Sequence, residues 1–463
     1  MSLSITRSAA GTFVRTAVLF LAVALLAGSA TAEPTDESAA QTAAPAQSTE
    51  TGAASDTSAP AAPKAAPTAP EATPPGATPG SIAPSAEEKI KATIPIYYLG
   101  KKYDEPLPLS VVEPIITDKG IQGARLAIED ANRVAPFTGY KYDLVEDIIP
   151  KKGDIVAKAK EILAKGNAFI VADLEPDDLI AVADLPEAKN SVLLNIRSSA
   201  EKLRQEDCRQ NVFHIIPDYA MRADALGQYL IWKKWPRWFV LRGDTKGDKD
   251  YLAQVERTAK RYGGKIVKES VYPFPPGARN LTSGYQQVQG QIPQATESAP
   301  DHDVLWVIDT NDDFGDYLMY RTYSPRPVVG TQGLKAEAWD PAYTESGANR
   351  IHSDFKKKVK RDMTERDYTA WLGTRTVTDS ILRSGKTTPT EVKDYMLSKD
   401  FNLEGYKRIA LNFRPWDHQM RQPIILGGTR VPVSTSPQEG FLHPTYTTDT
   451  LGYDKPETKC KFK

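Results

Sequence analysis

The chain has few of the residues that build thiolate or histidine metal sites. Its 463 residues include two cysteines, Cys208 and Cys460, and five histidines. The cysteines form no C-x-x-C pair, and the histidines are scattered without the spacing of metal ligands. These absences argue against a thiolate zinc site and leave the cysteines either as two free thiols or as one long-range disulfide.

The sequence also lacks the short motifs of common enzyme classes. It contains no G-x-S-x-G, no H-E-x-x-H, no P-loop and no G-x-G-x-x-G. Residues 199–202 and 353–356 fit S-x-x-K, but so short a pattern arises by chance and the companion K-T-G is absent. We therefore expect a protein that is not an enzyme and carries no cofactor. The formal net charge of -1 gives no reason to expect a nucleic-acid partner.

Residues 1–32 have the layout of a secretory signal peptide. Arg7 and Arg15 precede an apolar run at 17–27, and the small residues that follow end in an A-x-A site at Ala32. The run is well short of the roughly 20 residues that a membrane-spanning helix needs. We predict cleavage after Ala32 and no membrane insertion afterwards, with an uncleaved anchor as the alternative.

Residues 33–88 consist mainly of Ala, Pro, Thr and Ser, with almost no large apolar side chain. Such a segment cannot bury enough surface to offset its ordering entropy, so we predict a disordered linker. Secretion also implies an oxidising compartment, which favours a Cys208–Cys460 disulfide. That bond would tie the C-terminal tail to the body of the protein.

The remaining sequence alternates short apolar runs with amphipathic segments. Continuous apolar runs at 168–174 and 191–197 are separated by predicted helices, and Asp154 is placed to cap one of these helices. This pattern is typical of parallel strands covered on both faces. It restarts after about Pro217, with strands predicted at 237–243 and 304–308. Two such series predict two α/β lobes with a cleft between them at the carboxyl ends of the strands.

Three segments carry a resemblance to a known family: GARLAIEDAN at 123–132, VFHIIPD at 212–218 and RWFVLRGDTKGDKDYLAQ at 237–254. In this order they resemble the type I periplasmic solute-binding proteins, and within them the branched-chain amino-acid receptors of ABC importers. The likeness covers roughly residues 94–427.

Three further segments narrow the resemblance: YYLG at 97–100, DCRQNVFH at 207–214 and PQEGFLHP at 437–444. They are similar to substrate-binding proteins that accompany PQQ-dependent alcohol dehydrogenase systems in the periplasm.

The resemblance implies a periplasmic-binding-protein-like I fold of the α/β class, with two doubly wound parallel-sheet lobes, a hinge and a ligand cleft. It also implies that the chain crosses between the lobes three times. The N-terminal lobe would comprise 89–216 and about 351–408, and the C-terminal lobe 217–350 and about 409–435. Residues 436–463 would form a wrapping tail.

The resemblance further indicates where a ligand would bind. In the family, small hydroxyl residues after the third and fourth strands hold an amino acid, together with an aromatic and an acidic residue from the second lobe. Here the corresponding positions carry Asp173, then Arg197, Ser198 and Ser199, and the acidic position falls on or near Gln332. Because this set departs from the pattern in two places, we expect a solute that is not a typical free amino acid.

Aspartates end three of the predicted strands: Asp173, Asp244 and Asp309. Each could cap a neighbouring helix or loop. Three carboxylates facing one cavity could instead attract a cation or bind a hard metal such as calcium or a lanthanide. Arg197 could pair with one of them or hold an anionic ligand.

We therefore predict a periplasmic substrate-binding protein of an ABC-type importer, linked to PQQ-dependent alcohol oxidation. Its partners would be a small solute and an ABC permease or a periplasmic quinoprotein dehydrogenase. The alternative is an accessory protein with the same fold that binds calcium or a lanthanide, or that docks on the dehydrogenase. The sequence leaves the ligand, the partner and the oligomeric state open.

Overall fold

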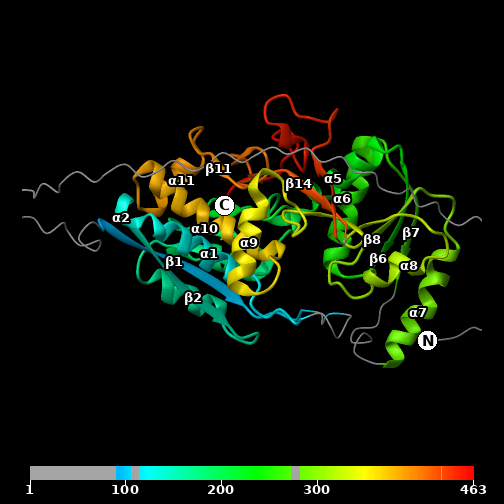
Figure 1. The fold of residues 1–463 in the computed structure, drawn as a ribbon, viewed down its shortest axis with the longest axis horizontal. Coiled ribbons are helices and arrows are strands. Elements are labelled where there is room, and N and C mark those ends of the chain that lie inside the picture. The colour runs from blue at the N-terminus through cyan, green and yellow to red at the C-terminus, as the bar shows by residue number, and fades with distance from the viewer. Residues whose placement is uncertain (1–89, 106–107, 109–113, 273–281, 429) are drawn as a thin grey trace, which may run out of the picture. The chain divides into compact units, whose positions relative to one another are not determined.

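The computed structural model describes residues 90–105, 108, 114–272, 282–428 and 430–463. The predicted signal peptide and linker lie outside these residues. The described part is an α/β fold with two large sheets and one small one (Figure 1). None of the described helices is long and apolar enough to cross a membrane.

The first sheet has the strand order β2-β1-β3-β4-β5, and all of its pairings are parallel. Its strands are β1 (Ala92–Lys101), β2 (Tyr140–Ile149), β3 (Phe169–Asp173), β4 (Val192–Asn195) and β5 (Val212–His214). Every residue of β3 and β4 is buried. This burial confirms the prediction of parallel strands covered on both faces.

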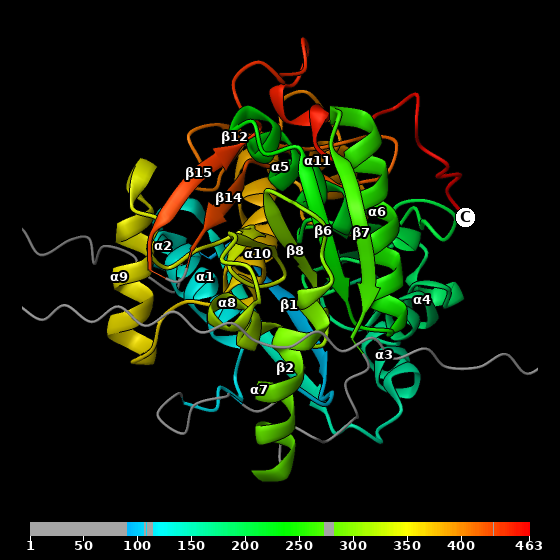
Figure 2. The same cartoon turned by 90° about the vertical axis from the view of Figure 1, so that its right-hand side faces the viewer.

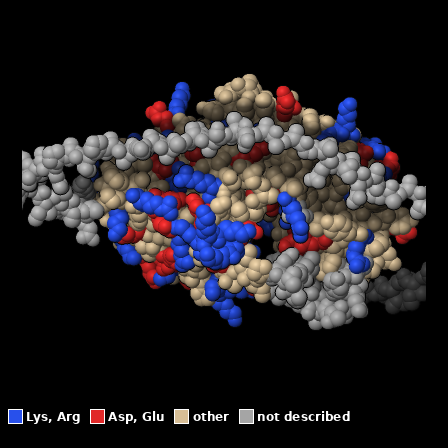
Figure 3. All heavy atoms as spheres, in the orientation of Figure 1, with Lys and Arg blue, Asp and Glu red and all other residues tan. Residues whose placement is uncertain are grey.

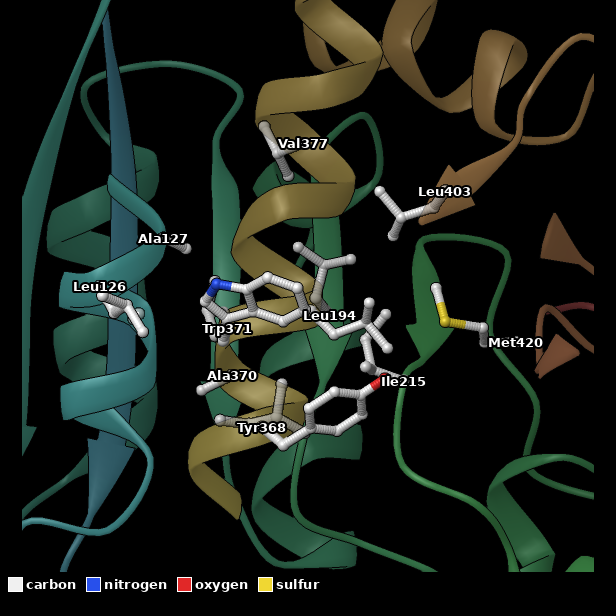
Figure 4. Packing of buried hydrophobic residues seen from close by; sticks show 14 of the residues in the cluster. Leu126, Ala127, Leu194, Ile215, Tyr368, Ala370, Trp371, Val377, Leu403 and Met420 are labelled. Carbon is white, nitrogen blue, oxygen red and sulfur yellow. The ribbon is translucent and has the colours of Figure 1, made fainter. Parts of the chain in front are cut away.

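Helices cover both faces of this sheet. They are α1 (Ile121–Arg133) and α10 (Glu365–Ser384) on one face, and α3 (Ile155–Leu163) and α4 (Pro176–Ala183) on the other. Alternate residues of β3 divide between the two cores: Val171 packs with α1 and α10, and Ile170 packs with α3 and α4. Figure 4 shows the first of these cores, with Trp371 of α10 turned toward α1. Asp154 caps α3 as predicted, since its carboxylate accepts the N–H groups of Val156 and Ala157.

The second sheet has the order β15-β14-β10-β9-β8-β6-β7. Its strands are β6 (Arg237–Arg242), β7 (Lys265–Val271), β8 (Val304–Ile308), β9 (Val328–Gly330), β10 (Leu334–Glu337), β14 (Ile424–Gly427) and β15 (Pro432–Ser436). The first five are parallel, whereas β14 and β15 pair antiparallel. The antiparallel edge was not expected from the sequence. Because β15 runs antiparallel beside β14 (Figure 2), a short connection is enough to join these two strands.

The second sheet is also covered on both faces. One face packs against α5 (Tyr219–Trp232) and α6 (Lys246–Tyr262), and the other against α7 (Thr282–Glu297) and α8 (Leu318–Arg321). All five residues of β8 are buried, and they alternate between the two cores. The two lobes are therefore doubly wound, as predicted.

The remaining elements complete the lobes and the tail. They are α2 (Ala135–Thr138), α9 (Ala348–Val359), α11 (Pro389–Met396), and a small sheet of β11 (Leu403–Glu404), β12 (Ala410–Phe413) and β13 (Met420–Arg421). The predicted disulfide is present, with 2.09 Å between the sulfurs of Cys208 and Cys460. In the tail, Asp449 is buried and accepts hydrogen bonds from Arg414 and Arg421.

Candidate functional site

Two adjoining cavities are lined by loops from both large sheets. The larger has a volume of about 960 Å³ and the smaller about 740 Å³. They share Arg197 and Ser199, which follow β4, and Tyr219, the first residue of α5. Cavities of roughly 300–1,000 Å³ are typical of small-molecule sites. We call the two cavities together the cleft.

Arg197 is fixed on the first-sheet side of the cleft by its neighbours. The Asn195 side-chain oxygen accepts the backbone N–H groups of Arg197 and Ser198 at 3.2 and 2.9 Å, so it shapes the loop after β4. The Arg197 guanidinium donates to Glu175 at 2.7 Å and to Asp173 at 3.2 Å. A ligand that binds Arg197 must therefore compete with carboxylates already in place.

Asp173 lies behind Arg197 and lines neither cavity of the cleft. Its side chain accepts a hydrogen bond of 2.8 Å from the Tyr98 hydroxyl, and Arg366 of α10 lies 3.8 Å away. The residue is 7% exposed. It acts on the cleft through Arg197, whose orientation it supports.

Glu105 is a carboxylate that lies among the cations on this side of the cleft. It pairs with Arg366 and with Lys119, the latter at 2.8 Å, and lies 3.5 Å from Arg197. Partial burial raises the pKa of Glu105, but Arg366 and Lys119 outweigh this effect and lower it to about 2. The side chain is thus ionised at neutral pH, and it offsets part of the positive charge of Arg366, Lys119 and Arg197.

Asp309 holds the loop on the second-sheet side. It follows β8, and its carboxylate accepts the backbone N–H groups of Asp313, Phe314 and Gly315 at 2.9, 2.7 and 2.7 Å. Burial raises its pKa to about 6, although these three hydrogen bonds act in the opposite direction. Asp309 lines the smaller cavity, but both of its oxygens are occupied by the loop.

Gln332 also lines the smaller cavity. Its amide donates to Asp312 at 2.8 Å, and its carbonyl oxygen accepts from the Thr331 hydroxyl. Gln332 is 1% exposed. Its position is therefore set by the loop, and its partner Asp312 borders both cavities.

Two residues that line the smaller cavity, Arg222 and Glu365, form an ion pair. Arg222 donates to both carboxylate oxygens of Glu365 at 2.9 Å. Burial raises the pKa of the nearby Glu337 to about 7, against the lowering effect of Lys335. Glu337 therefore holds its proton more tightly than an exposed glutamate does.

The sequence profile of the family described as periplasmic binding protein matches residues 114–430. This chain belongs to the periplasmic binding protein family. A comparison with curated proteins finds no significant match.

Solved structures share the fold of this periplasmic binding protein. One of them is a branched-chain amino acid ABC transporter periplasmic ligand-binding protein from Burkholderia xenovorans, which is 14% identical in sequence. The alignment has a TM-score of 0.62 and covers 80% of this chain and 100% of the Burkholderia chain. A leucine-, isoleucine-, valine-, threonine- and alanine-binding protein from Brucella ovis in its closed conformation is 16% identical, with a TM-score of 0.59 and coverages of 80% and 99%. A solute binding protein of an ABC transporter from Rhodopseudomonas palustris, in complex with 3,4-dihydroxy benzoic acid, is 13% identical, with a TM-score of 0.52 and coverages of 74% and 97%.

The three strand-end aspartates of this periplasmic binding protein do not come together. Asp244 points into solvent with 65% of its side chain exposed, pairs with Arg242 and Lys249, and lines neither cavity. Asp173 and Asp309 have the separate partners described above. Within the described ranges, no group of three His, Cys, Asp or Glu side chains is arranged to hold a metal ion.

Several cleft residues of the periplasmic binding protein were not singled out from its sequence. Lys119, Arg366 and Tyr219 border both cavities, and Trp339 lines the smaller one. A local signal existed for Arg366, because the capping box formed by Thr364 and Asp367 marks the start of α10. Nothing local indicates that this helix start faces the loop after β4.

Proposed function

We propose that this protein binds a small polar solute in the cleft and delivers it to an ABC-type importer from the periplasm. The observation that carries the proposal is the shared lining of the two cavities. Arg197 and Ser199 from the first sheet face the same space as Tyr219 and Thr310 from the second. A solute held by both sides would favour the closed form of two lobes joined by a hinge.

The chemistry of the lining favours a solute with an anionic or hydroxyl-rich group beside an apolar body. Arg197, Arg366 and Lys119 supply cationic donors, while the stacked rings of Tyr219 and Tyr251 supply an apolar surface on the opposite side. The relatives named above include binders of amino acids and of an aromatic acid. We favour an organic acid over a free amino acid because a buried glutamine, Gln332, stands at the expected acidic position.

The link to PQQ-dependent alcohol oxidation rests on sequence resemblance and stays a prediction, as does docking on a periplasmic quinoprotein dehydrogenase. The carboxylate of an alcohol-derived acid would bind the cationic donors Arg197, Arg366 and Lys119. The alternative of a calcium or lanthanide binder has no supporting cluster of carboxylates in the described part of the chain.

Isothermal titration calorimetry of the purified protein tests the proposal, with leucine, 3,4-dihydroxybenzoate, acetate and ethanol as probes. We expect saturable binding of a carboxylic acid and at least tenfold weaker binding of leucine. Arg197→Gln should weaken binding about 10- to 100-fold, because it removes a charged donor, and Ser199→Ala about fivefold. Small-angle scattering should show a smaller radius of gyration at saturation.

Two variants serve as matched controls. Arg125→Gln removes an exposed arginine paired with Glu146, and Ser353→Ala removes an exposed hydroxyl on α9. Both should leave binding unchanged. The proposal would be contradicted if none of the four probes binds. It would also be contradicted if binding does not change in Arg197→Gln and Ser199→Ala.

A further inference from the structure

A third cavity lies away from the cleft, between α1, α9 and α10. Its volume is about 350 Å³, and it is bordered by Leu126, Ala131, Ile351, Trp371 and Leu382. No residue that lines this cavity also lines the cleft. We call it the helical pocket. A water molecule occupies roughly 30 Å³ in the liquid, so the pocket has room for far more than one bridging water.

The helical pocket contains a buried hydrogen-bond donor without a partner. Trp371 is 2% exposed, and its indole Nε1–H has no hydrogen-bond partner among the described residues. Figure 4 shows this nitrogen turned toward α1, on the side where Ala127 borders the pocket. Buried polar groups in native proteins nearly always have partners, so an unpaired donor beside a cavity indicates an acceptor that the described residues do not supply.

Two other buried tryptophans have an unpaired Nε1–H but differ in their surroundings. Trp306 packs within the core of the second sheet, and Trp339 borders the smaller cavity of the cleft. Trp371 alone of these three borders the helical pocket. Its ring is held in place, because it stacks with Tyr368 and Tyr406 and Arg375 lies over it at 4.8 Å. The donor is therefore preorganised.

The charges at the rim of the helical pocket largely neutralise one another. Asp130 pairs with Arg133 at 3.2 Å, and Asp379 pairs with Arg375 at 3.3 Å. Figure 3 shows Lys and Arg side chains gathered over the region of α9. The three lysines in the last turn of α9, Lys356 to Lys358, do not line the pocket. Arg350 and Asp354 also line the pocket, so three cations and three carboxylates balance at its rim. A pocket with apolar walls, balanced rim charges and one inward donor selects an uncharged ligand.

We propose that the helical pocket is a second ligand site, which takes a small uncharged aromatic or alicyclic molecule whose carbonyl or similar acceptor bonds to Trp371 Nε1–H. The apolar walls from α1, α9 and α10 enclose the ring of the ligand. This site is separate from the cleft, and its occupancy does not depend on the function proposed for the cleft.

Fluorine NMR of the full protein labelled with 5-fluorotryptophan tests this site. The seven tryptophans give separate probes, and Trp371→Phe assigns the signal of Trp371. Acetophenone should shift this signal saturably, and ethylbenzene, which has the same shape but no acceptor, should bind about tenfold more weakly because it lacks one hydrogen bond. Benzoate and phenethylamine, its charged counterparts, should bind more weakly than acetophenone.

Ala131→Leu should fill the pocket and reduce acetophenone binding at least tenfold. Ala157→Leu, on the exposed face of α3, is the matched control and should leave binding unchanged. In Trp371→Phe, acetophenone should no longer bind more tightly than ethylbenzene. The two affinities are measured by the signals of the other tryptophans and by calorimetry. A Trp371 signal that none of the probes shifts, an unchanged affinity in Ala131→Leu, or tighter binding of benzoate than of acetophenone would overturn the proposal.

Discussion

Asp173 and Asp309 occupy similar places in the two large sheets but have opposite kinds of partners. Asp173 ends β3 and interacts with side chains, namely the Tyr98 hydroxyl and the guanidinium of Arg197. Asp309 follows β8 and accepts three backbone N–H groups. A solute can compete for side chains, which move between rotamers, far more easily than for the backbone of a loop. The first-sheet side should therefore adapt to ligands, while the second-sheet side serves as a rigid wall.

The largest expected effect is that of Asp309→Ala on stability. This change leaves three backbone N–H groups without their acceptor, and buried unsatisfied groups cost about 1–3 kcal/mol each. Because part of the loop can rehydrate, we expect a loss of about 3–4 kcal/mol in the free energy of unfolding, measured by urea denaturation. If Asp309→Ala lowers the free energy of unfolding by less than Asp173→Ala does, the proposed contrast between the two sides is wrong.

The second effect is the pH dependence of stability that Asp309 should produce. Burial raises its folded pKa to about 6, above the ordinary value of 3.8, so the folded state binds this proton more tightly than the unfolded state. The resulting stabilisation is present below about pH 4 and is lost as pH rises to about 6, and it amounts to about 2–3 kcal/mol. The advantage of wild type over Asp309→Asn should shrink across this window in urea denaturation. A difference that is constant with pH would contradict the assignment.

A smaller effect is expected at Asp173. Asp173→Asn should cost about 1–2 kcal/mol, because Arg197 keeps Glu175 and Glu105 as partners. A double-mutant cycle with Arg197→Gln should give a coupling of about 1 kcal/mol. The exposed pair Arg125 and Glu146 is the control, with an expected coupling of about 0.5 kcal/mol or less. Equal couplings for the two pairs would show that Asp173 does not orient Arg197.

The smallest effect is expected at Asp244, the third strand-end aspartate. Its side chain is 65% exposed and its partner Lys249 is 56% exposed, while Arg242, which is 13% exposed, keeps Glu269 as a second partner. Asp244→Asn should leave the midpoint of thermal unfolding and the affinity for solutes unchanged. A clear change in either property would mean that Asp244 contributes to the cleft in a way that its position does not indicate.

Much of the fold could be predicted because its signals are local. Continuous apolar runs such as β3 and β8 predict strands buried on both faces, and Asp154 predicts the start of α3. The antiparallel edge of β14 and β15 could not be predicted, because the direction in which a returning strand enters a sheet depends on the tertiary path of the chain.

The site was less accessible to sequence reasoning. Ending a strand with an aspartate does not determine where the carboxylate points. At Asp244 the chain turns at once into α6, whose capping box at Thr245 and Asp248 directs the preceding residue outward. At Asp309 the following loop folds back over the carboxylate instead. Arg366, from an element far along the chain, reaches the cleft through packing of α10 against α1, which no local pattern reveals.

The disulfide has a consequence for how the protein is made. Cys460 follows Cys208 by 252 residues, so the bond cannot close until nearly the whole lobed body has been synthesised. With two cysteines in the sequence, one intramolecular pairing is possible, and no isomerase is needed to correct a wrong internal bond. The hazard is instead a bridge between two nascent molecules through Cys208. In the folded protein, with the tail bonded in place, Cys208 is fully buried, and that route is closed.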